Sequence, residues 1–107
     1  HMDSEEILDA QCQKAEKIIE EVARTFGVSS DDIRSSKRAS SISNARQTAI
    51  YIAREITQMS MSSLGAEFGG RDHSTVVYAI QQVEKTMKKD SKTKAMVEDI
   101  IKNIRDR

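Results

Sequence analysis

Apolar residues recur at three- and four-residue steps along most of this chain, and no stretch alternates between apolar and polar residues as a strand does. The first such series predicts an amphipathic helix that begins at Ser4 and ends near Gly27. The chain has no proline, the residue that breaks helices most strongly, so none interrupts these patterns. We therefore expect an all-α fold. The apolar positions of the first helix are Ala15, Ile18, Ile19, Val22 and Phe26.

Five further helices are predicted, joined by short connections. A capping pair, Ser29 and Asp32, starts a short helix, and a loop rich in serine and basic residues follows at 35–43. A second short helix closes at Gly69-Gly70. The helices after the first are expected at about 31–35, 45–59, 62–68, 72–89 and 97–104.

The 107 residues are enough for one compact domain and too few for two. We expect residues 1–27 to hold a tag remnant, His1-Met2, and a linker helix, and residues 28–107 to form the functional domain. The single Cys12 can form neither an internal disulfide nor a metal cluster, and no other group has metal-ligand spacing, so no metal site is expected. Neither a signal peptide nor an apolar run of membrane-spanning length occurs, and a cytoplasmic location is expected.

Charge is distributed unevenly along a chain whose net charge is zero. Residues 1–32 hold nine acids and three bases, residues 34–54 hold five bases and no acid, and residues 55–107 hold nine bases and eight acids. A basic block within a neutral domain can bind a polyanion such as nucleic acid. It can also be a solvated helix face, and the charge alone does not decide between the two.

A short helix, a glycine-containing turn and a longer amphipathic helix follow one another at 62–89, which is the form of a helix-turn-helix. Gly69 and Gly70 permit the backbone angles of a tight turn. Asp72 stands where the N-cap of the second helix belongs, and the next three residues, beginning at His73, are short and polar. In such motifs these first residues contact base edges in the major groove. By itself the segment is also typical of an ordinary capped helix with an exposed histidine.

The segment at 69–76, GGRDHSTV, is similar to the signature of the C-terminal DNA-binding domain of the bacterial chromosomal replication initiator DnaA, where GGRDHTTV is usual. The segments SKR at 36–38, ARQTAIYIAREIT at 45–57 and LGAEF at 64–68 follow the same family in order and spacing. The resemblance covers about residues 13–105. It implies sequence-specific binding of double-stranded DNA at short boxes of the TTATCCACA type in the replication origin, in a bacterial protein associated with the nucleoid.

The resemblance also implies roles for individual residues. Arg38, in the basic loop, matches an arginine that enters the minor groove, where a narrow A·T-rich groove attracts a guanidinium. The residues implied to read bases, from the second motif helix and from the start of the first, are Asp72, His73, Ser74, Thr75, Met61 and Ser62. The implied phosphate-side positions are Lys37, Arg46, Gln47, Arg54 and Arg71.

Four positions depart from the family pattern. Ser74 lacks the methyl group of the usual threonine, and Ser40 replaces a residue that is often basic, so one base contact and one phosphate contact are weakened. Ala45 and Ser62 stand where proline is common, which changes backbone rigidity more than chemistry.

Two other classes of function compete with DNA binding. An enzyme is not expected, because the chain has no P-loop pattern and no nucleophile with a supporting histidine and acid. ATP and Mg²⁺ are expected only in an upstream module that family members carry. The alternative is an interaction module that acts through the N-terminal helix, with regulatory proteins or acidic lipids as partners. Acids outnumber bases on that helix and would repel anionic lipid, which favours packing on its own domain or on a neighbouring module.

Overall fold

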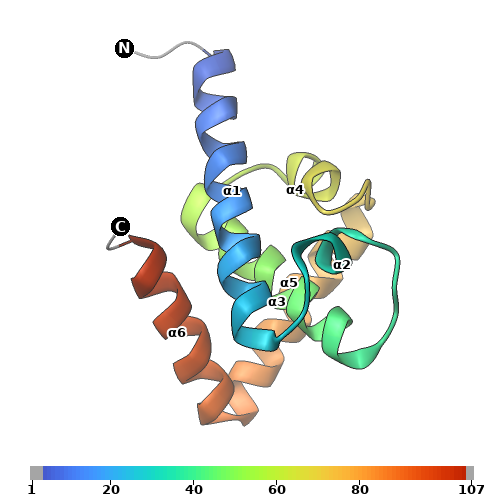
Figure 1. Cartoon of the computed structure of the whole chain (residues 1–107), viewed down its shortest axis with the longest axis vertical. Coiled ribbons are helices and arrows are strands. Elements are labelled where there is room, and N and C mark those ends of the chain that lie inside the picture. Colours follow the sequence, from blue (N-terminus) through green and yellow to red (C-terminus); the bar gives the residue numbers. More distant parts are fainter. Residues whose placement is uncertain (1–3, 106–107) are drawn as a thin grey trace.

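The computed structural model describes residues 4–105, apart from the side chains of residues 7–9, 11 and 12. This part of the chain forms six helices and no strand, which confirms the all-α prediction (Figure 1). His1-Met2 and the side chain of Cys12 lie outside the described part, so the expectations for them stay predictions. The helices are α1 (Ser4–Phe26), α2 (Ser30–Arg34), α3 (Ser40–Thr57), α4 (Met61–Glu67), α5 (His73–Lys89) and α6 (Ser91–Arg105).

Serine side chains cap the two short helices. The Ser29 hydroxyl accepts a hydrogen bond from the Asp32 N–H at 3.0 Å, which confirms the predicted start of α2. The Ser60 hydroxyl accepts from the Ser63 N–H at 3.1 Å at the start of α4. Each cap satisfies one of the N–H groups that the first turn of a helix leaves without a partner, and such a bond is worth about 1 kcal/mol.

Both ends of α3 differ from the prediction. The helix begins at Ser40, so the basic loop is 35–39 rather than 35–43. Serine and asparagine favour caps and turns, but here Ser40 and the residues up to Asn44 lie in the helix. At the other end, Gln58 adopts a left-handed conformation with φ of 57° and stops the helix. Met59 therefore lies in the connection to α4, from which it packs into the core.

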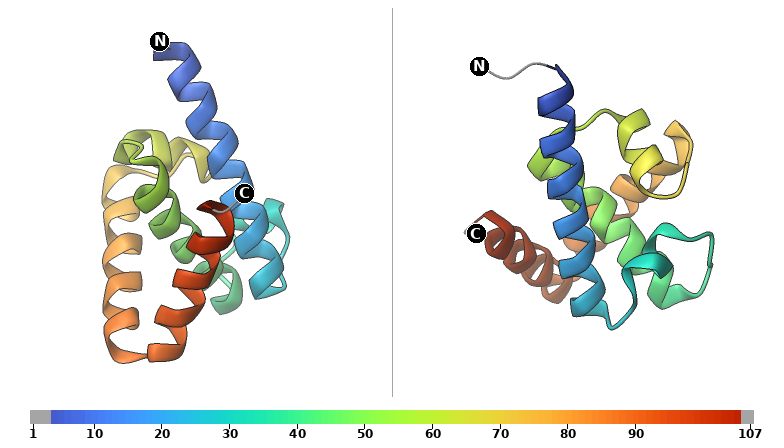
Figure 2. Two further views of the ribbon diagram at one scale, coloured as in Figure 1. Left: turned by 90° about the vertical axis from the view of Figure 1, so that its left-hand side faces the viewer. Right: turned by 45° about the horizontal axis from the view of Figure 1, so that its top comes forward.

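The long helix α3 lies at the centre of the molecule. It packs against α1 and α5 and also contacts α2, α4 and α6. The last two helices, α5 and α6, form an antiparallel hairpin that is seen side by side in the left view of Figure 2. In Figure 1, α6 lies on one side of α1, and α2, α4 and the start of α5 lie on the other. The loop 35–39 and the turn between α4 and α5 therefore face the same side of the molecule.

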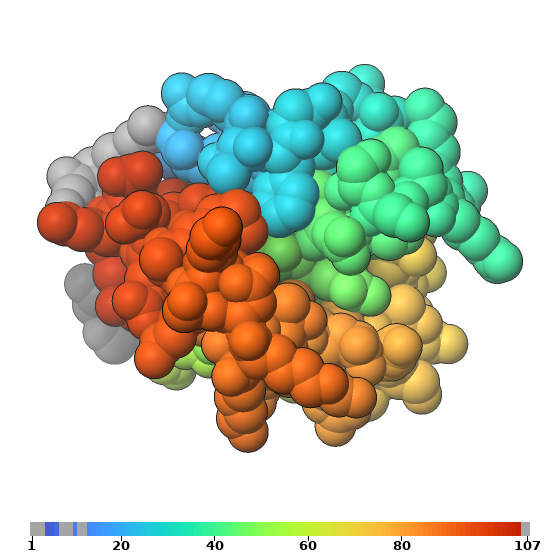
Figure 3. Space-filling view, turned by 90° about the horizontal axis from the view of Figure 1, so that it is seen from below, coloured from blue at the N-terminus to red at the C-terminus, as the bar shows by residue number. Residues whose placement is uncertain are grey.

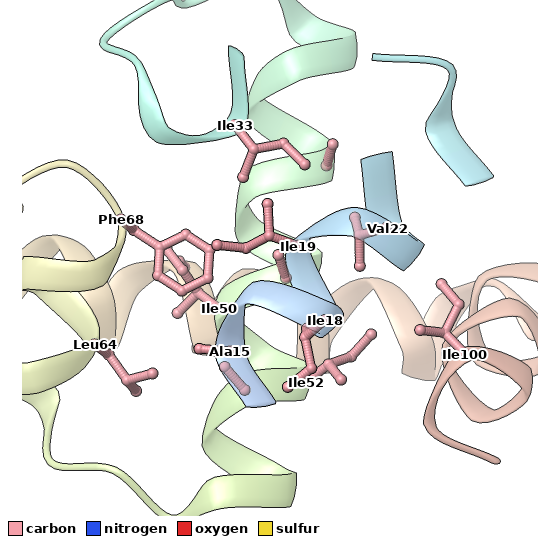
Figure 4. Packing of buried hydrophobic residues seen from close by; sticks show 14 of the residues in the cluster. Ala15, Ile18, Ile19, Val22, Ile33, Ile50, Ile52, Leu64, Phe68 and Ile100 are labelled. Carbon is pink, nitrogen blue, oxygen red and sulfur yellow. The ribbon is translucent and has the colours of Figure 1, made fainter. Parts of the chain in front are cut away.

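One hydrophobic core joins all six helices. Phe68 enters it from the end of α4 and lies beside Ile19 and Ile50 (Figure 4). Phe68 and Leu64 are fully buried, which confirms that they anchor the first motif helix. Replacing a buried leucine or phenylalanine with alanine typically costs about 2–5 kcal/mol, so these two side chains hold the motif firmly on the domain.

The second half of α1 belongs to this core. Ile18 and Val22 are fully buried, and α1 packs mainly on α3. The core thus includes residues from both sides of residue 27. The apolar face of residues 15–23 is therefore buried within the domain, while the first half of α1 extends beyond the body of the domain (Figure 1). Within residues 4–105, no helix combines the length and the apolar character needed to cross a bilayer.

Candidate nucleic-acid interface

The two motif helices, α4 and α5, are joined closely at Gly65. Its carbonyl accepts hydrogen bonds from the backbone N–H groups of Gly70 and Arg71, both at 2.9 Å. A Cβ atom on Gly65 would lie 2.0 Å from the Arg71 carbonyl oxygen, so any side chain there would push the turn away from α4. This contact fixes the point from which α5 begins.

The start of α5 is exposed and capped by Asp72. Its Oδ1 atom accepts from the Thr75 N–H at 2.8 Å, which confirms the predicted N-cap. Hydrogen bonds from the side chain and the backbone of Thr75 hold the pKa of Asp72 below its ordinary value, so the carboxylate is charged at neutral pH. His73 and Ser74 are exposed together with Thr75. The first turn of α5 therefore presents polar side chains and free N–H groups to solvent.

The turn between α4 and α5 also packs on the C-terminal end of α2. Gly69 has a φ of 89°, and a Cβ atom on it would lie 2.2 Å from the carbonyl oxygen of Arg34. The Nη2 atom of Arg71 donates to the carbonyl oxygen of Ser35 at 2.5 Å. These two contacts bring the start of α5 next to the loop 35–39.

The basic loop carries two exposed cations. The Arg38 guanidinium is exposed and forms no hydrogen bond or ion pair with any described residue. Lys37 is also exposed, and its Nζ atom lies 2.7 Å from Oδ1 of Asp32. This bond from Lys37 lowers the pKa of Asp32. In Figure 3 the segment near residue 40 projects from the edge of the molecule. The structure thus places Arg38 where a partner can reach it.

Arg46, a phosphate-side position in the resemblance, lies largely inside the domain. The residue is 7 % exposed. Its Nε atom donates to the carbonyl of Ile33 at 2.7 Å, and its Nη2 atom donates to the carbonyl of Asp32 at 3.1 Å. Burial, and then the positive charge of Arg71, lower the pKa of Arg46 from its ordinary value. Sequence reasoning finds the charge of this arginine but not its burial.

Three other predicted phosphate positions are partly engaged within the domain. Arg54 is half-buried and donates to the carbonyl of Met59. Gln47 is half-buried and lines an open hollow of about 260 Å³ that α1, α3, α5 and α6 surround. The Nε atom of Arg71 is buried without a partner among the described residues, and Nη2 holds Ser35. Of the five predicted phosphate positions, Lys37 is the one that is exposed.

The start of α4 and the middle of α5 complete the surface. Ser62 is exposed, whereas Met61 is half-buried and packs against the core. Tyr78, which the sequence analysis does not single out, is 51 % exposed and lies one turn after Ser74 on α5. The four-residue spacing from Ser74 places Tyr78 on the same helix face and is the signal that could have found it.

Among the described side chains, no three His, Cys, Asp or Glu residues gather closely enough to hold a metal ion. The hollow beside Gln47 is lined by uncharged residues, Phe26, Thr48 and Gln82 among them, and these offer no acid–base pair. Exposed hydrogen-bonding groups and cations instead lie together at the loop and at the start of α5.

These elements lie within a segment that matches a known family. The family described as "Bacterial dnaA protein helix-turn-helix" matches residues 15–83, which is well over half of the chain. The chain belongs to this family. The matched segment contains the buried half of α1, the basic loop and the start of α5, and the match confirms the resemblance drawn from residues 69–76.

Individual relatives agree with this assignment. The chain is 43% identical over 89 residues to the chromosomal replication initiator protein DnaA of Thermodesulfovibrio yellowstonii, covering 83% of this chain and 20% of the relative. It is 44% identical over 79 residues to the protein of the same name from Pelobacter propionicus, covering 74% and 18%. The chain thus spans about a fifth of the length of these curated relatives.

A solved structure shares the fold. The crystal structure of a DNA replication initiation factor superposes with a TM-score of 0.81 and 34% sequence identity. The likeness covers 90% of this chain and 29% of that one. A similarity of this extent supports the all-α helix-turn-helix architecture for nearly the whole chain.

Proposed function

We propose that this chain binds double-stranded DNA in a sequence-specific manner, with the start of α5 in the major groove and Arg38 in the minor groove. The observation that carries the proposal is that the exposed, capped start of α5 and the exposed basic loop lie side by side at the end of α2. Membership of the DnaA helix-turn-helix family supports it, because the second helix of such a motif lies in the major groove.

The first turn of α5 has the groups that base reading needs. His73, Ser74 and Thr75 are short, so the backbone can approach the base edges closely. The Asp72 carboxylate can accept from the amino group of cytosine, and the Thr75 methyl can contact that of thymine. The free N–H groups of this turn are suited to a phosphate oxygen.

The loop and the start of α4 supply the remaining contacts of the proposal. Arg38 fits a narrow A·T-rich minor groove, whose negative potential attracts a guanidinium. Lys37 beside it binds a phosphate, and Ser62, with part of Met61, touches DNA from the start of α4. Arg54 adds charge from α3. Phosphate contacts of this kind orient the protein without reading the sequence.

The relatives suggest where such binding takes place. They are named chromosomal replication initiator proteins, and we place this chain as the part that holds such a protein on boxes of the TTATCCACA type in the origin, in the bacterial cytoplasm. The proposal assigns no cofactor to this chain. ATP and Mg²⁺ chemistry would belong to a separate module, and regulatory proteins are further proposed partners.

Titration of two exposed variants against two duplexes tests the proposal. His73→Ala should weaken binding to the box roughly tenfold and should change binding to a scrambled duplex of equal length little, because a base contact is lost. Lys37→Ala should weaken both equally, because phosphates carry no sequence. Equal losses on both duplexes for His73→Ala would show that His73 reads no base and would contradict its proposed role in the major groove.

A further inference from the structure

The loop that carries Arg38 and the start of α5 are distant in the sequence and meet at the end of α2. We propose that Arg71 is a positioning residue: by holding the carbonyl of Ser35, it fixes the Arg38 loop relative to α5, so that both segments engage one DNA site at once. The inference rests on the proposed function and gives Arg71 a different role from that of a phosphate contact.

Arg71 is rigidly connected to α5 and reaches across to the loop. Its backbone N–H donates to the carbonyl of Gly65 at 2.9 Å, and the next residue, Asp72, caps α5. Its side chain spans a sequence separation of 36 residues to donate to Ser35 at 2.5 Å. Arg71 therefore connects the turn of the helix-turn-helix to Ser35, the first residue of the loop.

The end of α2 is built to hold guanidinium groups. Its backbone carbonyls at Asp32 and Ile33 accept from Arg46, and the carbonyl of Ser35 accepts from Arg71. Neither arginine forms an ion pair with a described carboxylate, and burial lowers the pKa of each. Carbonyls at the C-terminal end of a helix carry partial negative charge, and they suit a planar guanidinium with several donors better than a compact ammonium.

Ser35 is held from the loop side as well. Its hydroxyl donates to the carbonyl of Asp32 at 2.6 Å and accepts from the N–H of Lys37 at 3.2 Å. Residues 36–38 then lead directly to Ala39, the N-cap of α3. A short loop fixed at both ends loses less conformational entropy when it binds, so the hold on Ser35 contributes to affinity without a contact to DNA.

Backbone dynamics of the free protein test the first half of the proposal. Nitrogen-15 relaxation should show lower order parameters for residues 36–38 in Arg71→Met than in the parent chain. The matched control is Arg54→Met, which removes another half-buried arginine that donates to a backbone carbonyl, at the far end of α3. Unchanged order parameters in Arg71→Met would overturn the proposal, even if the chain bound no DNA.

A double-mutant cycle on box DNA tests the second half. Arg38→Ala should weaken binding about tenfold in the parent and in the Arg54→Met background, but less than about threefold in the Arg71→Met background. An Arg38 effect of equal size in all three backgrounds would make Arg71 an independent contact and overturn its positioning role. If the parent does not prefer the box, the proposed function fails, and the relaxation experiment still decides whether Arg71 orders the loop.

Thermal melting shows whether Arg71→Met is folded before either experiment. If it is not, Arg71→Lys replaces it, because lysine keeps the stem and the charge but lacks the planar fork. Arg71→Lys should also mobilise residues 36–38 and reduce the effect of Arg38→Ala. A lysine variant identical to the parent in both measurements would overturn the proposal.

Discussion

Replacing Gly69 with alanine should destabilise the fold more than replacing its neighbour Gly70. Both glycines have positive φ, 89° and 76°. An alanine is disfavoured in that region by roughly 1–2 kcal/mol. At Gly70 nothing lies within 4 Å of an added Cβ, whereas at Gly69 the Cβ would lie 2.2 Å from the carbonyl oxygen of Arg34. A backbone oxygen cannot rotate aside as the tip of a side chain can, so the turn or α2 has to move.

The size of the effect follows from that contact. The ordinary range of such contacts begins at 3.4 Å, so the turn and α2 must separate by more than 1 Å. Overpacking in a well-packed region typically costs about 1–3 kcal/mol. Gly69→Ala should therefore lose about 2–5 kcal/mol of unfolding free energy, and Gly70→Ala about 1–2 kcal/mol.

Chemical denaturation followed by far-ultraviolet circular dichroism measures both variants. Equal losses for the two alanines would refute the close packing of the turn on α2. The docked turn also sets the position of α5, so Gly69→Ala should weaken binding to the box more than Gly70→Ala at a temperature where both are folded. The reverse order would separate the turn from DNA recognition.

Three further predictions follow from the charges of the interface. If about three exposed or half-exposed basic side chains near the loop contact phosphates, the logarithm of the DNA-binding constant should fall with the logarithm of the salt concentration with a slope of about −3. A slope steeper than about −5 would mean that the buried arginines also contact DNA. Arg38→Lys should lose affinity for the box and keep the melting temperature, because Arg38 has no partner among the described residues. If the parent and the variant lose the same affinity when the A·T pairs of the box are changed to G·C, Arg38 contacts a phosphate and does not read the minor groove. The hydrogen bonds from Thr75 lower the pKa of Asp72 in the folded chain. The ionised carboxylate therefore stabilises the fold at pH values above 3.8, and this stabilisation is lost as the pH falls through the lower pKa of the folded state. Asp72→Asn, which caps without titrating, should lose less stability than the parent between about pH 6 and about pH 2, and an equal loss would show that this cap is not titrating.

The sequence predicts the helices well because their signals are local. The apolar spacing of α1 and the caps at Ser29 and Asp72 involve residues within a few positions of one another, and the structure bears out each of them. The helix-turn-helix is also predictable, since Leu64 and Phe68 one turn apart and the following Gly69-Gly70 all lie in one short segment.

The parts that sequence reasoning misses depend on distant partners. The burial of Arg46 follows from carbonyls at the end of α2, 13 and 14 residues away in the chain. Arg71 reaches Ser35 across 36 residues. The start of α3 at Ser40 is missed for a different reason, because serine and asparagine have the local preferences of turns and caps. The sequence thus shows which residues are charged, but it does not show which distant atoms those residues contact.

The most direct test of the account is an equilibrium titration of the unaltered chain with a duplex that carries the TTATCCACA box and with a scrambled duplex of equal length and composition. Both titrations are made at one stated salt concentration, because phosphate contacts alone give salt-dependent affinity for any sequence. The account predicts that the box binds at least about a hundredfold more tightly than the scrambled duplex. Equal affinity for the two duplexes would contradict sequence-specific recognition by α5 and Arg38.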